Sequence, residues 1–280
     1  MTSGSTVFRG QPAVALSLPA GDRAVVALHG AHLLSWTTAD GVERIYLSPE
    51  ALFDGRSAIR GGVPVCWPQF NQRGPLPKHG FARHVPWHVA EPVSAAGEGR
   101  LVLVLDDSAA TRAIWPQRFG LQLTVALRPQ QLRLTLDVRN PGGTPWHFTT
   151  ALHSYLRVDD IAQARLEGLT GAACWDALRD VRRAEASQAL RFDAEFDRVY
   201  TAPPAPLKLV QPAGALQIEQ SATCSETVVW NPGAGLSAQL TDLPDDGHRH
   251  MLCVEAARID EPVTLASGAA WQGWQQLTVL

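Results

Sequence analysis

Lysine is nearly missing from this 280-residue chain: only Lys78 and Lys208 occur, and arginine supplies nearly all of the positive charge. The formal net charge is -3 at pH 7, so the chain lacks the basic excess that marks nucleic-acid binding proteins. We therefore expect no nucleic-acid partner. The scarcity of lysine also makes Lys78 more noticeable than any single arginine.

Long apolar runs are missing as well. No stretch approaches the roughly 20 apolar residues that a transmembrane helix requires. The N-terminal sequence MTSGSTVFRGQPAVALSLP lacks the basic start and long apolar core of a secretory signal. We expect a cytoplasmic protein with no membrane partner.

The cysteines form no recognisable framework. No CxxC pair occurs, and the spacings match neither a zinc site nor a disulfide scaffold. Buried, reduced thiols are the simplest interpretation for all four, which are Cys66, Cys174, Cys224 and Cys253. Gly-rich phosphate loops, HExxH and GxSxG are also absent. We expect no metal and no cofactor.

The hydrophobic pattern that is present has the period of β-strands. It is clearest in residues 121–127 and 131–138, where every second residue is apolar and a hairpin at 128–130 joins the two runs. Only residues 111–119 leave room for a short helical turn, before Pro116. Similar runs predict strands over 24–37, 43–48, 100–105, 146–158, 207–210, 215–220, 227–231 and 250–259.

Strands at this density, with turns about every eight to twelve residues, favour an all-β fold. We expect a large antiparallel β-sandwich, with residues 1–280 forming one domain of two packed sheets.

Residues 59–87, IRGGVPVCWPQFNQRGPLPKHGFARHVPW, cannot form an ordinary strand or helix. Four prolines between Pro64 and Pro77 each remove a backbone donor, and four glycines in the stretch add backbone freedom. The stretch nevertheless carries large apolar residues together with Arg60, Lys78, His79 and Arg83. This mixture is typical of an ordered functional loop, although a surface segment with solvated charges has the same composition.

Two polar residues lie within otherwise apolar strands. Alternation in 146–158 places His153 on the polar face, with Tyr155 two residues further on. Glu255 lies between Val254 and Ala256, where an unpaired carboxylate is costly. It requires either a functional role or an ion-pair partner such as Arg249 or Arg258. His29 and His32 also neighbour apolar residues, and structural roles are the commoner outcome for such histidines.

Six ordered motifs carry a family resemblance. They are IRGGVPVCWPQF, LPKHGFARHVPW, ALHSYLRVDDI, FDRVY, VVWNP and MLCVEAA. In this order and spacing the chain resembles the hexose-6-phosphate mutarotase (glucose-6-phosphate 1-epimerase) branch of the aldose 1-epimerase superfamily, from GAHLLSW near residue 30 to the C-terminus. The resemblance implies a galactose mutarotase-like supersandwich that acts on a small sugar phosphate as a monomer.

The resemblance also implies roles for particular residues. His153 corresponds to the general acid and Glu255 to the general base. Arg60 and Arg83 correspond to the arginines that bind the sugar phosphate, and His79 to the histidine that lines the pocket.

Two further positions follow from the same comparison. Asp197 corresponds to the aspartate that contacts sugar hydroxyls. Lys78 departs from the family pattern, in which a neutral polar residue is common, and an extra cation here would strengthen phosphate binding or alter sugar preference.

The chemistry suits these residue types. Interconversion of anomers needs a base for the anomeric hydroxyl and an acid for the ring oxygen, and neither a metal nor a nucleotide is required. We expect the two groups to lie on opposite sides of the sugar ring.

Two other functions remain open from the sequence. A sandwich of this fold could bind a sugar phosphate without catalysis and act as a regulator, since fold does not fix function. A lyase or glycosidase is the third reading, because a glycosidase uses a facing pair of carboxylates, for which Asp197 and Glu255 are candidates.

Overall fold

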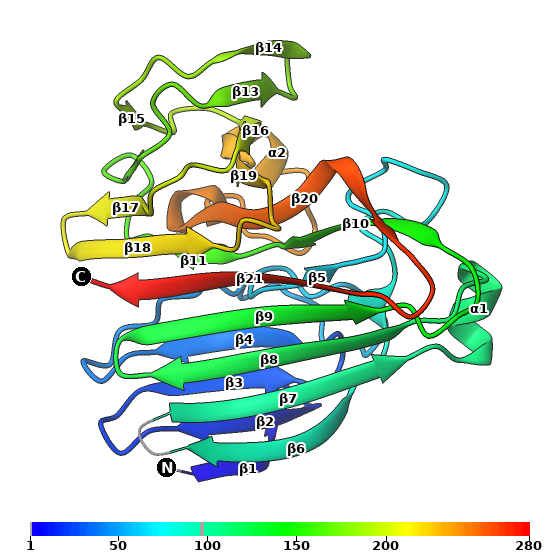
Figure 1. Cartoon of the computed structure of the whole chain (residues 1–280). Coiled ribbons are helices and arrows are strands. Elements are labelled where there is room, and N and C mark those ends of the chain that lie inside the picture. Colours follow the sequence, from blue (N-terminus) through cyan, green and yellow to red (C-terminus); the bar gives the residue numbers. More distant parts are fainter. Residues whose placement is uncertain (1, 96–97) are drawn as a thin grey trace.

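The computed structural model describes residues 2–95 and 98–280, and most of its regular structure is antiparallel β-sheet (Figure 1). The predicted all-β sandwich class is therefore confirmed. Short helical segments occur only between strands in this part of the chain. They are α1 (Ala109–Ile114), α2 (Gly233–Ser237) and the 3₁₀ turns η1 (Ala82–His84) and η2 (Gly247–His250). No helix among the described residues is long and apolar enough to cross a membrane.

The strands form three sheets. The nine-stranded sheet has the order β15 (Ala189–Leu190), β12 (Arg165–Glu167), β17 (Leu207–Gln211), β18 (Gly214–Gln220), β21 (Ala270–Val279), β9 (Gln131–Arg139), β8 (Gly120–Arg128), β7 (Glu98–Asp106) and β6 (His88–Ala95). The four-stranded sheet has the order β1 (Thr2–Phe8), β2 (Gln11–Ser17), β3 (Arg23–Ala27) and β4 (His32–Thr37).

The third sheet, of eight strands, carries the site described below. Its order is β14 (Val181–Ala184), β13 (Ala173–Asp176), β16 (Phe196–Thr201), β19 (Glu226–Asn231), β20 (Met251–Leu265), β10 (Trp146–Leu152) and β5 (Val65–Cys66). The short strand β11 (Tyr155–Arg157) also pairs with β20.

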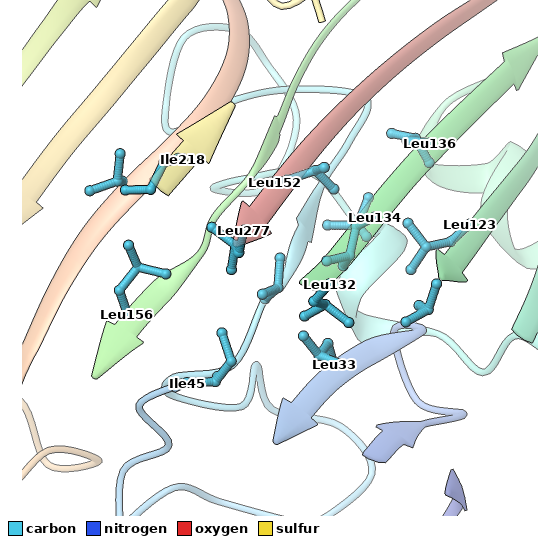
Figure 2. Packing of buried hydrophobic residues seen from close by; sticks show 14 of the residues in the cluster. Leu33, Ile45, Leu123, Leu132, Leu134, Leu136, Leu152, Leu156, Ile218 and Leu277 are labelled. Carbon is cyan, nitrogen blue, oxygen red and sulfur yellow. The ribbon is translucent and has the colours of Figure 1, made fainter. Parts of the chain in front are cut away.

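The main core lies between the sheets. The apolar residues of every second position on β8 and β9 point inward, as period-2 patterning requires, and are almost fully buried. Figure 2 shows Leu132, Leu134 and Leu136 of β9 packed with Leu152 and with residues from the other sheets. Burial of this apolar surface is the main source of the stability of the fold.

Some local predictions were wrong. Residues 24–37 form two strands, β3 and β4, because Gly30 and Ala31 adopt left-handed conformations that turn the chain back on itself. Residues 43–48 make isolated bridges instead of a regular strand. The predicted strand 146–158 divides into β10 and β11 at His153–Ser154.

The N-terminal hairpin was not predicted at all. β1 and β2 pair over their whole length around Arg9 and Gly10, both at positive φ. Two consecutive residues at positive φ are characteristic of the tight turns that join twisted hairpin strands. The sequence signal was weak because β1 contains Thr, Ser and Gly, with Val7 exposed.

The irregular segment 59–87 is ordered by a buried aromatic cluster. Trp67 is fully buried, and its ring centroid lies 4.7 Å from that of Phe119 and 5.2 Å from that of Trp115. Behind it the chain returns so closely that Gly80, at φ 70°, faces the Trp67 carbonyl. The packing fixes both ends of the loop that carries Lys78 and His79.

Gly80→Ala tests this close approach. A Cβ at position 80 would lie 2.1 Å from the Trp67 carbonyl oxygen, so backbone must shift in addition to the left-handed strain. We expect the free energy of unfolding, measured by urea titration, to fall by about 3 kcal/mol. Gly143→Ala is the control because a Cβ there meets nothing within 4 Å. Equal stabilities for the two variants would contradict the argument.

Candidate active site

A cavity of about 240 Å³, lined by both polar and apolar side chains, opens at the eight-stranded sheet. It is smaller than the roughly 300–1,000 Å³ of pockets for drug-sized ligands, which suits a monosaccharide derivative. Its lining comes from the 59–87 segment, from the break between β10 and β11, and from β16, β19, β20 and α2. The lining residues are Arg60, Phe70, Asn71, Lys78, His79, His153, Tyr155, Glu195, Asp197, Val228, Trp230, Leu236, Leu240 and Glu255.

Glu255 reaches the cavity because β20 keeps strict alternation. Leu252 and Val254 enter the main core, whereas Met251 and Cys253 pack in a smaller cluster on the opposite face. Glu255 shares that opposite face and pairs in register with Val228 of β19. The strand thus delivers a carboxyl group, 1% exposed, to the end of an apolar stripe.

His153 reaches the same place because β10 and β11 keep a single register with β20, in which Leu152 pairs with Ala256 and Tyr155 with Cys253, so that His153 lies opposite Glu255. Its backbone N–H donates to the Pro64 carbonyl at 3.0 Å, and the Tyr155 N–H donates to the Gly62 carbonyl at 2.9 Å. On this edge the chain bonds to the 59–87 segment, and on its other edge the Val254 N–H of β20 donates to the Ser154 carbonyl at 3.1 Å. The His153 side chain is consequently directed toward Glu255.

The two groups are in contact: Nε2 of His153 lies 3.4 Å from Oε1 of Glu255. Neither Arg249 nor Arg258 pairs with Glu255, since they pair with Asp160 and Glu261. The contact also contradicts the expectation that acid and base lie on opposite sides of a sugar, because no ring fits into this gap.

Burial decides the charge of the pair. It raises the pKa of Glu255 well above the ordinary value, and the nearby Asp197 raises it further. Burial also lowers the pKa of His153 well below the ordinary value, with added repulsion from His79, Arg83 and Arg60. Two charges would attract at this distance, but removing both from water costs more than the attraction returns. We therefore assign a protonated carboxyl and a neutral imidazole.

His79 is held as a neutral donor. Its Nδ1 accepts the backbone N–H of Asn71 at 3.2 Å, which leaves the ring proton on Nε2. Burial, together with Arg83 and Lys78, lowers the pKa of His79 to about 3. Its ring stands edge-to-face to that of His153, with centroids 5.5 Å apart.

The predicted cations occupy different positions. Arg60 lines the cavity, and its Nε donates to Oδ1 of Asp242 at 3.1 Å. Lys78 lines the cavity with an exposed side chain. Arg83 is not among the lining residues; its Nη2 donates to the Lys78 carbonyl at 3.1 Å. Arg83 thus supports the Lys78 backbone from outside.

Asp197 also lines the cavity, close to Glu195. Burial raises its pKa, and the charge of Glu195 raises it further. Its neighbour Arg198 faces away and pairs with Asp176 and Glu185, which secures β16 behind the cavity.

Several lining residues were not predicted as site residues. The ring of Tyr155 lies parallel to that of His153, with centroids 4.9 Å apart and planes at 10°. Strand alternation had already placed these two residues on one face. Trp230, Asn71 and Glu195 had no comparable signal, because the motifs that contain or adjoin them do not indicate where the chain folds back.

The chain has no described cluster that suits a metal. Among residues 2–95 and 98–280, no group of three or more His, Cys, Asp or Glu side chains lies close enough to hold an ion. The described cysteines are all buried and unpaired with one another.

A buried carboxyl–imidazole pair in a cavity of an antiparallel supersandwich defines a site for acid–base chemistry on a small hydroxylated ligand. A model of the family described as aldose 1-epimerase matches residues 12–278, so the chain belongs to that family and is an enzyme of it.

Curated relatives agree with this assignment. A protein of Cenchrus ciliaris named "Putative glucose-6-phosphate 1-epimerase" is 35% identical over 260 residues, covering 89% of this chain and 79% of its own. A protein of Escherichia coli with the same name is 36% identical over 244 residues, covering 85% and 81%. The crystal structure of a "putative mutarotase" from Salmonella typhimurium superposes with a TM-score of 0.90 at 30% identity, covering 99% of this chain and 93% of that one.

The proton on Glu255 predicts how its removal changes stability. The folded-state pKa lies above the ordinary value of 4.5, so the folded protein keeps a proton that the unfolded chain loses as pH rises. Above pH 4.5, keeping this proton costs the wild-type protein folding free energy. Glu255→Gln avoids that cost because an amide does not titrate. At pH 8 we expect it to unfold with about 1–3 kcal/mol more free energy than wild type, and at pH 4 with about the same.

Denaturant titrations at both pH values measure this difference. Glu261→Gln is the control, since its side chain is 84% exposed. A Glu255→Gln variant less stable than wild type at pH 8 would mean that the carboxylate is charged and well stabilised in the fold.

Proposed function

We propose that the protein interconverts the α and β anomers of a hexose 6-phosphate, with glucose 6-phosphate as the expected substrate. The observation that carries the proposal is the contact between His153 and Glu255 inside a cavity that also presents Arg60 and Lys78. The names of the curated relatives support the same substrate.

The reaction needs proton transfers at two oxygen atoms, the anomeric hydroxyl and the ring oxygen. The anomeric hydroxyl and the ring oxygen are both bonded to C1, so groups in contact with each other can serve them side by side. Glu255 takes the proton of the hydroxyl while His153 protonates the ring oxygen, and the C1–ring oxygen bond breaks. After rotation about C1–C2, the ring oxygen attacks the other face of the aldehyde and the protons return.

Before substrate binds, the pair already holds the one proton that the acid must give to the ring oxygen. Carboxyl plus neutral imidazole holds one transferable proton, as does carboxylate plus imidazolium. Moving that proton across the 3.4 Å contact prepares Glu255 as the base and His153 as the acid without exchange with solvent. Because opening and closure are the reverse of each other, the pair ends as it began.

The other lining residues bind the substrate. The Nε2–H of His79 is available as a donor to a sugar oxygen, and the Asp197 carboxyl group accepts sugar hydroxyls. Arg60 and Lys78 attract the phosphate, with Arg83 acting through the Lys78 backbone and its charge. A phosphate anchored away from C1 supplies binding energy for orienting the reacting end.

We propose that a monomer is active, because this chain by itself supplies the carboxyl group, the imidazole and the cations that the proposed reaction uses. A sugar phosphate is charged and does not cross membranes freely. We therefore keep the cytoplasm as the proposed location.

Loss of either member of the pair tests the chemistry. We expect Glu255→Gln and His153→Asn each to lower kcat by about 10²–10⁴-fold, since each removes one proton transfer. Exchange NMR between α- and β-glucose 6-phosphate measures the rate above the uncatalysed background. Binding of the sugar phosphate by wild type with no added exchange would instead select the non-catalytic regulator.

Lys78→Gln tests the phosphate contact. Removing an exposed cation should raise KM for glucose 6-phosphate about threefold to tenfold and leave turnover of plain glucose unchanged. Lys208→Gln is the matched control, because the only other lysine lies exposed on β17 outside the cavity lining. An equal loss with both sugars would argue against a phosphate role for Lys78.

A further inference from the structure

Arg60 is already engaged on two sides. Its Nε donates to Oδ1 of Asp242 at 3.1 Å, and its Nη1 donates to the hydroxyl of Tyr155 at 3.2 Å. Nη2 makes no hydrogen bond to any residue that the structure describes. The guanidinium is planar and rigid, so fixing one edge orients the others.

Tyr155 connects this arginine to His153. Its ring is 3% exposed and lies nearly parallel to the imidazole, with centroids 4.9 Å apart. Trp230 stands edge-on to both rings, at 6.2 Å from His153 and 6.1 Å from Tyr155. The imidazole plane therefore follows the plane of Tyr155, whose hydroxyl is held by Arg60.

The other end of the chain of contacts is also fixed. Asp242 lies between α2 and η2, and its backbone carbonyl accepts the hydroxyl of Ser48 at 2.7 Å. The side chains of Arg60 and Asp242 are 22% and 19% exposed, so their pair is only partly screened by solvent. Asp242 had no signal in the sequence because 182 positions separate it from Arg60.

We propose that Asp242, Arg60 and Tyr155 form a positioning relay, through which an anion bound at Nη2 of Arg60 aligns the His153 imidazole with Glu255. This inference rests on the proposed function. A bound dianion stabilises the aligned arrangement relative to looser ones, and a ligand shifts such an equilibrium only by its difference in affinity for the two. The phosphate then raises the turnover of the sugar in addition to holding it.

The relay predicts activation by an anion that is not attached to the sugar. With D-glucose as substrate, phosphite dianion should occupy the Arg60 site and raise kcat/KM for anomer exchange saturably, by about tenfold or more. Exchange NMR on the full-length protein, with the uncatalysed and phosphite-only rates subtracted, measures it. Turnover of glucose 6-phosphate is recorded on the same preparation.

Tyr155→Phe separates the relay from simple packing. It keeps the aromatic ring on His153 and removes the hydroxyl that Arg60 holds, so we expect phosphite activation to fall below about threefold. Tyr46→Phe is the matched control: Tyr46 belongs to the same apolar cluster but does not line the cavity. It should retain the wild-type activation.

Asp242→Asn provides a second variant if Tyr155→Phe fails to fold. It retains an oxygen for Arg60 and removes the charge, and it should also reduce the activation. The relay is overturned if phosphite activates Tyr155→Phe as strongly as it activates wild type. If only Asp242→Asn folds, the same result in that variant overturns it. The relay is also overturned if the wild-type protein turns over glucose 6-phosphate but phosphite leaves its anomer exchange of glucose unchanged or inhibits it. Wild type inactive on glucose 6-phosphate rejects the proposed function itself, and the relay with it.

Discussion

One contact governs the site: a carboxyl group and an imidazole, both withdrawn from water, lie 3.4 Å apart. In water the carboxyl group would be ionised at neutral pH, and the imidazole would be partly protonated because its ordinary pKa is about 6.5. Inside the sandwich the charged forms lose their solvation, so the pair shares one proton and carries no net charge. The cavity accordingly holds a carboxyl group and an imidazole next to each other, with little access to water.

The fold is arranged so that this contact forms. β20 carries Glu255 on the face opposite to the main core, and the unbroken register from β10 to β11 places His153 directly across from it on the same face. The 59–87 segment accepts the backbone N–H groups of His153 and Tyr155 through the carbonyls of Pro64 and Gly62. Its own shape depends on the buried Trp67 and on glycines that permit close backbone approach. The irregular segment thus helps to position His153 as well as forming a wall of the cavity.

The sequence was informative wherever a local pattern determines the structure. Period-2 alternation predicted β8 and β9 and placed His153 with Tyr155 on one face. The isolated Glu255 in an apolar strand was recognisable because burial of a carboxyl group is costly. Other features depend on contacts between distant residues. No local pattern could show that Arg83 stays outside the cavity lining, that Arg60 meets Asp242, or that acid and base are in contact instead of flanking a ring.

The protonation of Glu255 in the ligand-free protein is the most direct test of this account. Infrared difference spectroscopy at pH 7, comparing wild type with Glu255→Gln, reports it through the carbonyl stretch that the substitution removes. We expect the substitution to remove a protonated carboxylic acid band. Loss of carboxylate bands would show that the buried pair is charged and would contradict the shared-proton description.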